Sequence, residues 1–437
     1  MPAIRFGGST VLWLAIGVAA LAHSAYWAFD HEHYAVDTAS YLIPADNFVH
    51  GRGFVNDLHQ PELRRTPGYP LLLALFRIAP LRLQDLIIVQ HALCGLLTAF
   101  VVVIGLRLSG SRVVALVAAA GLTLDLATLR IANLLMTEIV ATVLIALTAW
   151  TLYRAMANPS NNPRWITASG LLGGCAALVR PVGSLYFIPL SICLVLGLKG
   201  RALRPVLLFA GCFLLLPLLW ASRNYVEGGY FGISTIGGED ILYYRAAGAL
   251  AIQQPGSYLA NARRINSALI DQTCADLERL YQRDCSQVTE AQRASYASRK
   301  GVGIILSNPF SYFRSISLSL AYIVFGGGAE ALSRISNLGP RMAEYVVLVF
   351  TIPEALLAVV GCLYWYRRDQ RLFYVLVFTV GYFFAASAGA EAYSRFRVPV
   401  MPMYALLVGG GAAAISQAIQ DKGARRAALA TPIAMQP

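Results

Sequence analysis

The stretch Val11–Phe29, V-L-W-L-A-I-G-V-A-A-L-A-H-S-A-Y-W-A-F, is long, apolar and free of Asp, Glu, Lys and Arg. A helix needs about 20 such residues to cross the hydrocarbon core of a bilayer. Similar stretches recur along the chain. We expect further spans at 84–108, 113–129, 137–156, 165–179, 182–198, 204–222, 342–366, 371–388 and 398–418. The sequence therefore predicts an all-α integral membrane protein with about ten transmembrane helices.

The overall composition agrees with a membrane protein. The chain is 57% hydrophobic and only 13% charged, with a mean hydropathy of +0.58. Soluble domains carry about 25% charged residues. The net charge of +12 is dispersed among the short loops between spans. This distribution favours contact with lipid phosphate over a groove for nucleic acid.

The basic loops predict the orientation of the chain. They contain Arg5, Arg107/Arg112, Arg154/Arg164, Lys199/Arg201/Arg204, Arg367/Arg368/Arg371 and Lys422/Arg425/Arg426. Loops rich in Lys and Arg stay in the cytoplasm, which predicts cytoplasmic N- and C-termini. The apolar segment 308–325 would break this parity, so we interpret it as interfacial or re-entrant. The segment 68–80 is too short to span and is predicted to lie at the surface.

Three parts follow from this topology. Residues 1–222 form an N-terminal membrane module whose first outer loop is 30–83, and residues 308–437 form a C-terminal membrane module. Between them, the polar segment 223–307 is predicted to be an outer insertion with helical patterning around 257–300. It contains Cys274 and Cys285, which could pair in an oxidising compartment or stay free. The apolar N-terminus could also mimic a signal peptide, but the other spans need it for their orientation.

The first outer loop combines an acid with paired arginines. D-T-A-S-Y occupies 37–41, and R-R-T-P-G-Y-P occupies 64–70. On a helix, Asp37 and Tyr41 would share a face, although Asp37 could instead be an N-cap. Proline and glycine stiffen the turn after Arg64 and Arg65. Guanidinium groups bind phosphate oxygens in pairs.

Other ionisable residues gather at the outer ends of the expected spans. Together with the first loop they are Asp37, Arg64, Arg65, Asp125, Glu138, Arg180, Arg223, Glu239, Asp240, Glu391, Arg395 and Arg397. Charges are costly when they face lipid, so we expect them to line a shared wet cavity. The alternative is that each anchors one helix end in the headgroup layer.

In this order, several short motifs resemble the GT-C class of glycosyltransferases, multi-spanning enzymes that use polyprenyl-phosphate sugars. The class includes protein O-mannosyltransferases and the lipid A aminoarabinose transferase. The motifs are D-T-A-S-Y (37–41), R-T-P-G-Y-P (65–70), T-E (137–138), A-A-L-V-R-P (176–181), W-A-S-R-N-Y (220–225), S-T-I-G-G-E-D (234–240), N-P-F-S-Y-F (308–313) and S-R-F-R-V-P (394–399). The resemblance covers nearly the whole chain, and it rests on order and spacing.

The resemblance implies roles for individual residues. Asp37 corresponds to the catalytic base, and Glu138 to an acid that orients the acceptor or a sugar hydroxyl. Arg65 corresponds to a ligand of the lipid phosphate. The other implied donor or phosphate ligands are Arg64, Tyr41, Tyr69, Arg223, Asn224, Arg395 and Arg397. Glu391 and Asp240 are expected elsewhere in the same cavity.

These roles imply an inverting glycosyltransferase on the outer face of the bacterial inner membrane. It would move a sugar from a polyprenyl-phosphate donor to a hydroxyl of a glycan, a lipid or a protein. Thr38 stands where the class commonly has a second acid, which removes an obvious paired-carboxylate metal site. No cofactor is indicated, and dependence on a divalent metal stays open. Two alternatives stay open: a transporter or flippase of lipid-linked sugars, and a polysaccharide ligase or polymerase with the same donor.

Overall fold

The computed structural model describes residues 6–79, 81–158, 163–200, 202–390 and 393–430, and these residues form an all-helical protein. Within these ranges the only β-structure is an isolated bridge between Val55 and Pro61. Eight helices are long and apolar enough to cross a membrane, or up to ten if each of two bent helix pairs is one span. The predicted fold class, an all-α multi-pass membrane protein, is therefore confirmed.

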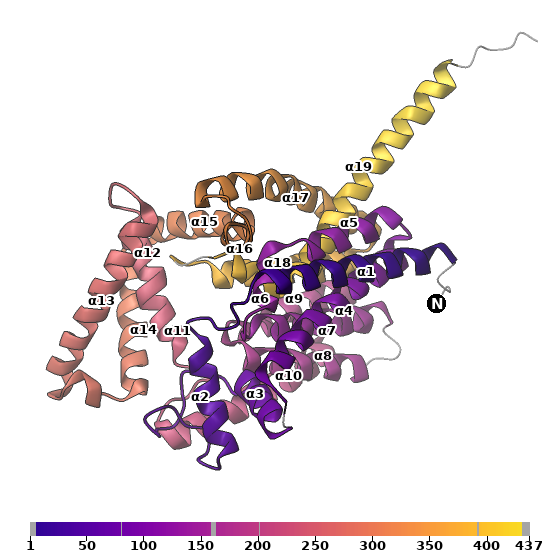
Figure 1. Ribbon diagram of the computed structural model, residues 1–437. Helices are drawn as coiled ribbons and strands as arrows, with labels where there is room; N and C mark the ends of the chain where they lie inside the picture. The colour runs from indigo at the N-terminus through magenta and orange to yellow at the C-terminus, as the bar shows by residue number, and fades with distance from the viewer. Residues whose placement is uncertain (1–5, 80, 159–162, 201, 391–392, 431–437) are drawn as a thin grey trace, which may run out of the picture.

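The spanning helices pack into one bundle. The start of its first helix and the end of its last helix lie on the same side (Figure 1). The bundle consists of α1 (Phe6–Phe29), α4 (Leu83–Ser109), α5 (Arg112–Thr123), α7 (Glu138–Ala157), α8 (Pro163–Val179), α9 (Phe187–Leu198), α10 (Leu203–Gly228), α17 (Pro340–Arg368), α18 (Gln370–Ser387) and α19 (Met401–Ala430). The facing side chains of α4 and the later helices of the bundle form the largest core among the described residues, which includes Phe213, Trp365 and Phe383.

Glycines bring α17 and α19 into direct backbone contact. A Cβ atom on Gly361 would lie 1.7 Å from the Leu407 carbonyl oxygen, and one on Gly411 would lie 2.0 Å from that of Leu357. Any side chain at either position would separate the two helices. Small residues allow close helix packing inside a membrane, where apolar burial alone does not drive association.

The expected span 113–129 is not one continuous helix. It divides into α5 and α6 (Leu126–Ala132), which are bent by 54° relative to each other. The break falls at Asp125, whose carboxylate accepts a hydrogen bond from the Thr128 amide (2.8 Å) and caps α6. The expected span is therefore interrupted, because this cap starts a new helix.

The expected span 165–179 corresponds to α8, which is shorter than the helices that qualify as spans by length and composition. It nevertheless runs antiparallel to α7 over the same depth. Glu138 at the start of α7 meets Arg180 just after α8, and Ala155 near the end of α7 lines a cavity with Ile166 near the start of α8. The geometry therefore supports its interpretation as a span.

The segment 308–325, interpreted as interfacial or re-entrant, forms α15 (Pro309–Phe325). It is followed after a short break by α16 (Ala329–Ile335), at an angle of 41°. Such a pair is either a broken span or a re-entrant loop. Thr351 of α17 donates a hydrogen bond to the Phe325 carbonyl (3.1 Å), which holds the end of α15 against the bundle.

Two further groups of helices lie at the end of the bundle opposite the start of α1 (Figure 1). The first outer loop contains α2 (Thr38–Val49) and α3 (Gly68–Ile78). An arm follows α10 and has its own small core. It consists of α11 (Ile236–Glu239), the π-helix η3 (Asp240–Ala246), α12 (Ala247–Ala251), α13 (Tyr258–Tyr281), the 3-10 turn η4 (Cys285–Gln287) and α14 (Glu290–Ser307). A disulfide joins Cys274 to Cys285.

Labelling of introduced cysteines can test the predicted orientation. Ala268 on α13 and Gly423 on α19 are exposed, and these two helices lie toward opposite ends of the molecule (Figure 1). We expect a membrane-impermeant maleimide to label Ala268→Cys in intact spheroplasts, and to label Gly423→Cys only after lysis. The unmodified protein measures the background from native thiols. Labelling of position 423 in intact spheroplasts would reverse the orientation.

Candidate active site

Asp37 lies at the start of α2, but its side chain does not cap the helix. Instead, its carboxylate binds two arginines from distant parts of the chain. Oδ1 lies 3.0 Å from Arg65 NH2, and Oδ2 lies 3.3 Å from Arg395 NH1. The structure therefore rejects the N-cap alternative and places Asp37 between two guanidinium groups.

Arg65 is fixed on several sides. Its Nε donates to Ser40 Oγ (2.8 Å) and its NH1 donates to the Tyr41 hydroxyl (3.1 Å). The guanidinium carbon lies 4.5 Å from the centre of the Tyr41 ring, a cation-π distance. The Glu62 carboxylate accepts from the backbone amides of Arg64 (2.7 Å) and Arg65 (2.8 Å), which fixes the turn before R-T-P-G-Y-P.

Arg395 reaches the same carboxylate from the 3-10 helix η5 (Ser394–Val400), which precedes α19. The side chains of Asp37 and Arg395 are 32% and 31% exposed, whereas that of Arg65 is 9% exposed. Asp37 and Arg395 are therefore accessible to a ligand, while Arg65 is buried against Ser40 and Tyr41. Arg395 Nε is buried and has no hydrogen-bond partner among the described residues.

Burial alone would raise the pKa of Asp37. The charges of Arg65 and Arg395, with their hydrogen bonds, outweigh it and hold the pKa below its ordinary value. The carboxylate is thus ionised at neutral pH. It would become a stronger base if an anion drew the arginines away from it.

A second ion pair lies beside the first. Glu138, fully buried at the start of α7, binds Arg180 NH1 at 2.7 Å, and the same nitrogen donates to Thr137 Oγ1 (3.1 Å). The Phe396 ring lies under both Arg180 (5.6 Å) and Arg395 (5.1 Å). The sequence analysis placed Arg180 among the charges expected to line the cavity but gave it no individual role.

Acidic residues of the arm close one side of this cluster. Glu239 binds Arg64 at 2.9 Å. The next residue, Asp240, opens the π-helix η3, and its burial raises its pKa to about 6 despite the nearby charges of Arg245, Arg180 and Arg64. π-helical turns are rare and often occur at functional sites.

The structure places several predicted ligands elsewhere. Arg397 is buried between Asp125 (2.8 Å) and Glu354 (2.9 Å) on the other side of η5, so it does not join the Asp37 cluster. Its charge is already matched by two carboxylates, so its position does not support a role in donor binding. It follows Arg395 by two positions, which is enough to turn its side chain to another face of the helix.

Arg223 and Asn224 lie within α10, which extends beyond the predicted end at 222. Arg223 donates to the carbonyls of Glu62 (3.0 Å) and Phe54 (2.8 Å), and Asn224 donates to that of Gly232 (2.8 Å). Both side chains thus brace backbone segments. Their contacts support a role in holding the loops around the site rather than in binding the donor.

Tyr69 is also internal. Its hydroxyl donates to Gln90 (3.2 Å), and its ring packs edge-on against Tyr41. Tyr69 therefore supports the Tyr41 ring, which contacts Arg65. Because Tyr69 is fully buried, it cannot contact a ligand itself. Glu391, predicted elsewhere in the cavity, lies outside the described residues.

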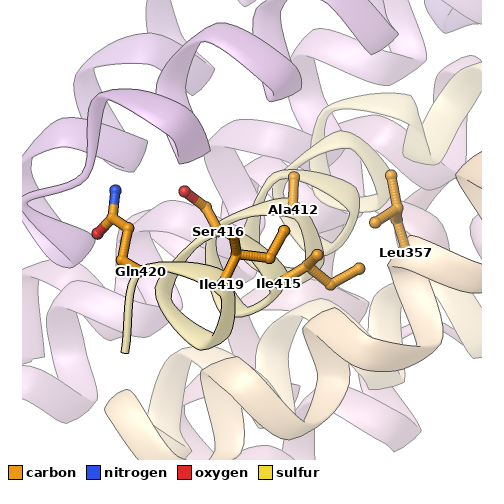
Figure 2. A pocket seen from close by; sticks show the side chains of 6 residues that line it. All are labelled: Leu357, Ala412, Ile415, Ser416, Ile419 and Gln420. Atoms are coloured by element: carbon orange, nitrogen blue, oxygen red, sulfur yellow. The ribbon is translucent and has the colours of Figure 1, made fainter. Parts of the chain in front are cut away.

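Neither a cluster of metal ligands nor the pocket between α17 and α19 assigns further chemistry to the described residues. In the described part of the chain, no three His, Cys, Asp or Glu side chains are arranged to hold a metal ion. A pocket of about 450 Å³ between α17 and α19 is lined by Leu357, Ala412, Ile415, Ser416, Ile419 and Gln420 (Figure 2). It has no ionisable lining residue, so we assign no chemistry to it.

Comparisons with known proteins agree with the sequence motifs. Residues 64–222 match the family described as dolichyl-phosphate-mannose-protein mannosyltransferase. This confirms the resemblance to the GT-C class over a segment that contains Arg65, Glu138 and Arg180. At the general level, the match supports glycosyltransferase activity; Asp37 and Arg395 lie outside the matched segment.

One of the solved structures that match this chain has a low structural similarity to it. It is the crystal structure of ArnT from Cupriavidus metallidurans bound to undecaprenyl phosphate, with 14% sequence identity and a TM-score of 0.42. The match covers 92% of this chain and 77% of that chain. No curated protein sequence matches the chain.

Proposed function

We propose that the protein is an inverting glycosyltransferase that moves a sugar from a polyprenyl-phosphate donor to a hydroxyl acceptor. The observation that best supports this proposal is the Asp37 carboxylate, which lies partly exposed between Arg65 and Arg395. Residues 64–222 match a family whose description names dolichyl-phosphate mannose. This compound is a polyprenyl-phosphate sugar. The proposed location is the outer face of a bacterial inner membrane, with both termini in the cytoplasm.

The two arginines suit the donor phosphate. A guanidinium binds phosphate oxygens through paired donors, and such charge-assisted hydrogen bonds are stronger than neutral ones. Arg395 is the more accessible of the two and has an unused Nε among its described contacts. A bound phosphate would share these donors with Asp37. The shift of positive charge toward the phosphate would raise the pKa of Asp37 and make it a better base.

The reaction then needs one base and one stabilised leaving group. The acceptor oxygen attacks the anomeric carbon while Asp37 takes the hydroxyl proton. The bond from that carbon to the phosphate oxygen breaks, and its electron pair leaves with polyprenyl phosphate. Arg65 and Arg395 stabilise the negative charge that develops there. A single displacement inverts the configuration at the anomeric carbon.

Glu138 and Arg180 are proposed to position the acceptor or a sugar hydroxyl. Arg180 neutralises the Glu138 carboxylate and fixes its direction at 2.7 Å. The Phe396 ring, which both Arg180 and Arg395 contact, connects this pair to the phosphate arginines. We further propose that transfer needs no metal ion, which an assay in excess EDTA will test.

The proposed function is tested by reconstitution. Purified protein in proteoliposomes, supplied with a donor labelled in both sugar and phosphate, should release polyprenyl phosphate in equal amount to the sugar that reaches an acceptor. A transporter would carry the intact donor across the bilayer without cleaving it. Translocation of uncleaved donor in the presence of membrane extracts as acceptor source would contradict the proposal.

Replacing Arg65 with Ala should weaken use of the donor. A charge-assisted hydrogen bond contributes about 1.5–3 kcal/mol, so the loss in kcat/KM should be about tenfold or more. Arg65→Lys should recover only part of it, because an ammonium lacks the planar fork. Steady-state kinetics against donor concentration measure both effects.

Arg77→Ala is the matched control for this change. Arg77 forms an exposed ion pair with Asp46 between α3 and α2, away from Asp37. It should leave donor kinetics unchanged. An unaltered kcat/KM in a folded Arg65→Ala protein would remove Arg65 from the donor site.

A further inference from the structure

A second polar cavity lies at the opposite end of the bundle from Asp37. Its volume is about 660 Å³. It lies among the end of α7, the start of α8, the end of α9 and the starts of α10 and α18. Glu138 begins α7 at the candidate active site, and a helix of this length spans about 30 Å. The cavity therefore faces the other surface of the membrane.

Three cationic side chains line this cavity: Lys199, Arg204 and Arg371. Among the described residues, none of the three forms an ion pair or a side-chain hydrogen bond. The lining residues in the described part of the chain include no carboxylate. The nearest acid in sequence, Asp369, accepts from the Tyr153 hydroxyl (2.8 Å) and from backbone amides at the start of α18. The three charges thus line one space in which the described lining residues contribute no carboxylate.

The backbone adds to this positive potential. The helices α8, α10 and α18 all begin at the cavity, and helix N-termini favour anions. The ends of α7 and α9 lie there too and act in the opposite sense, but Lys199 directly follows α9 and offsets its dipole. The remaining field therefore attracts an anion.

The rest of the lining is apolar, and it indicates the form of that anion. Ile166, Leu198 and Leu208 contribute hydrocarbon surface, together with prolines at the starts of α8 and α10. Leu208 is partly exposed on the side of the bundle, next to the exposed Leu207. The cavity therefore extends toward the lipid-facing surface. A small hydrophilic anion would leave this apolar wall uncovered, whereas a lipid chain would fill it.

We propose that this cavity binds the phosphate headgroup of an anionic membrane lipid, with Arg204, Arg371 and Lys199 around the phosphate and an acyl chain along α10. The site is separate from the Asp37 cluster and does not depend on the proposed sugar transfer. It would anchor the α8–α10 side of the bundle to the leaflet opposite the active site.

Thermal unfolding of the purified full-length protein in detergent micelles tests this site. Phosphatidylglycerol added to the micelles should raise the Tm of the wild type by about 2 °C or more, because a ligand of the folded state stabilises it. Phosphatidylcholine and inorganic phosphate should raise it much less. The double variant Arg204→Gln/Arg371→Gln should lose the phosphatidylglycerol effect, and the double Lys variant should keep most of it.

Arg112→Gln is the matched control, because Arg112 is an exposed arginine at the first residue of α5 and lies outside the cavity. It should respond to phosphatidylglycerol like the wild type. Native mass spectrometry, which counts retained lipids, should show the same ranking. An equal response of the double Gln variant and the wild type would overturn the proposal. An equal response of the wild type to inorganic phosphate would overturn the assignment to a lipid.

Discussion

Replacing Asp37 with Asn is expected to abolish sugar transfer while the protein stays folded and binds its donor. Asn nearly matches Asp in size but cannot accept a proton at neutral pH, so removal of the base predicts a rate loss of about 10²–10⁴-fold. The Asp37 side chain makes no capping hydrogen bond, so the helix α2 should not be affected. The substitution also frees Arg65 and Arg395, and donor affinity should therefore be kept or increase.

Single-turnover assays in proteoliposomes measure this loss directly, and donor binding is measured separately. Asp46→Asn is the control, since Asp46 lies on the same helix and its carboxylate also binds an arginine, Arg77. The control should transfer sugar at the wild-type rate. Near-wild-type turnover of Asp37→Asn would exclude Asp37 as the base, and Glu138 would be the next residue to test.

In the loop between α1 and α4, the sequence signals that concern Asp37, Tyr41 and Arg65 are local. Asp37 and Tyr41 share a face once α2 forms, and the Thr-Pro-Gly turn after Arg65 fixes where that guanidinium points. Arg65 then contacts both residues. The third partner, Arg395, is far away in sequence. Charge placement and the resemblance to a known class both put it in the same cavity as Asp37, but neither predicted their direct ion pair.

The sequence could not predict that Arg395 and Arg397 bind different carboxylates. Both precede the last span and both are arginines, so composition and charge treat them alike. Their directions are set by the 3-10 geometry of η5 and by which carboxylates lie on each side. Those carboxylates, Asp125 and Glu354, come from α6 and α17, whose positions depend on packing of the whole bundle.

A similar ambiguity affected Arg223 and Asn224. Polar residues in a motif at a span end can bind a ligand or satisfy the backbone, and the sequence pattern is the same in both cases. The structure shows them donating to carbonyls of the loops around the site. Buried carbonyls need such donors, which explains why the motif fits the class without touching the Asp37 cluster.

Arg397→Ala is expected to be the most destabilising single change in the protein. It would leave the buried carboxylate of Asp125 and the partly exposed carboxylate of Glu354 without a cation. Breaking a buried ion pair by removing one partner costs about 3–5 kcal/mol. Arg397 also donates to the Val324 carbonyl (3.0 Å), so the end of α15 would lose a contact. We expect a lower unfolding midpoint and poor recovery from the membrane.

Neutralising the two acids tests the cause. Asn at 125 can still cap α6, so adding Asp125→Asn and Glu354→Gln to Arg397→Ala should restore part of the lost stability. Thermal unfolding in detergent, with the donor absent, measures the three proteins side by side. A donor-binding role for Arg397 predicts a different result: Arg397→Ala would unfold at the wild-type temperature and lose only its affinity for the polyprenyl-phosphate sugar. That result would return Arg397 to the active site and would mean that the carboxylates of Asp125 and Glu354 are not held by its charge.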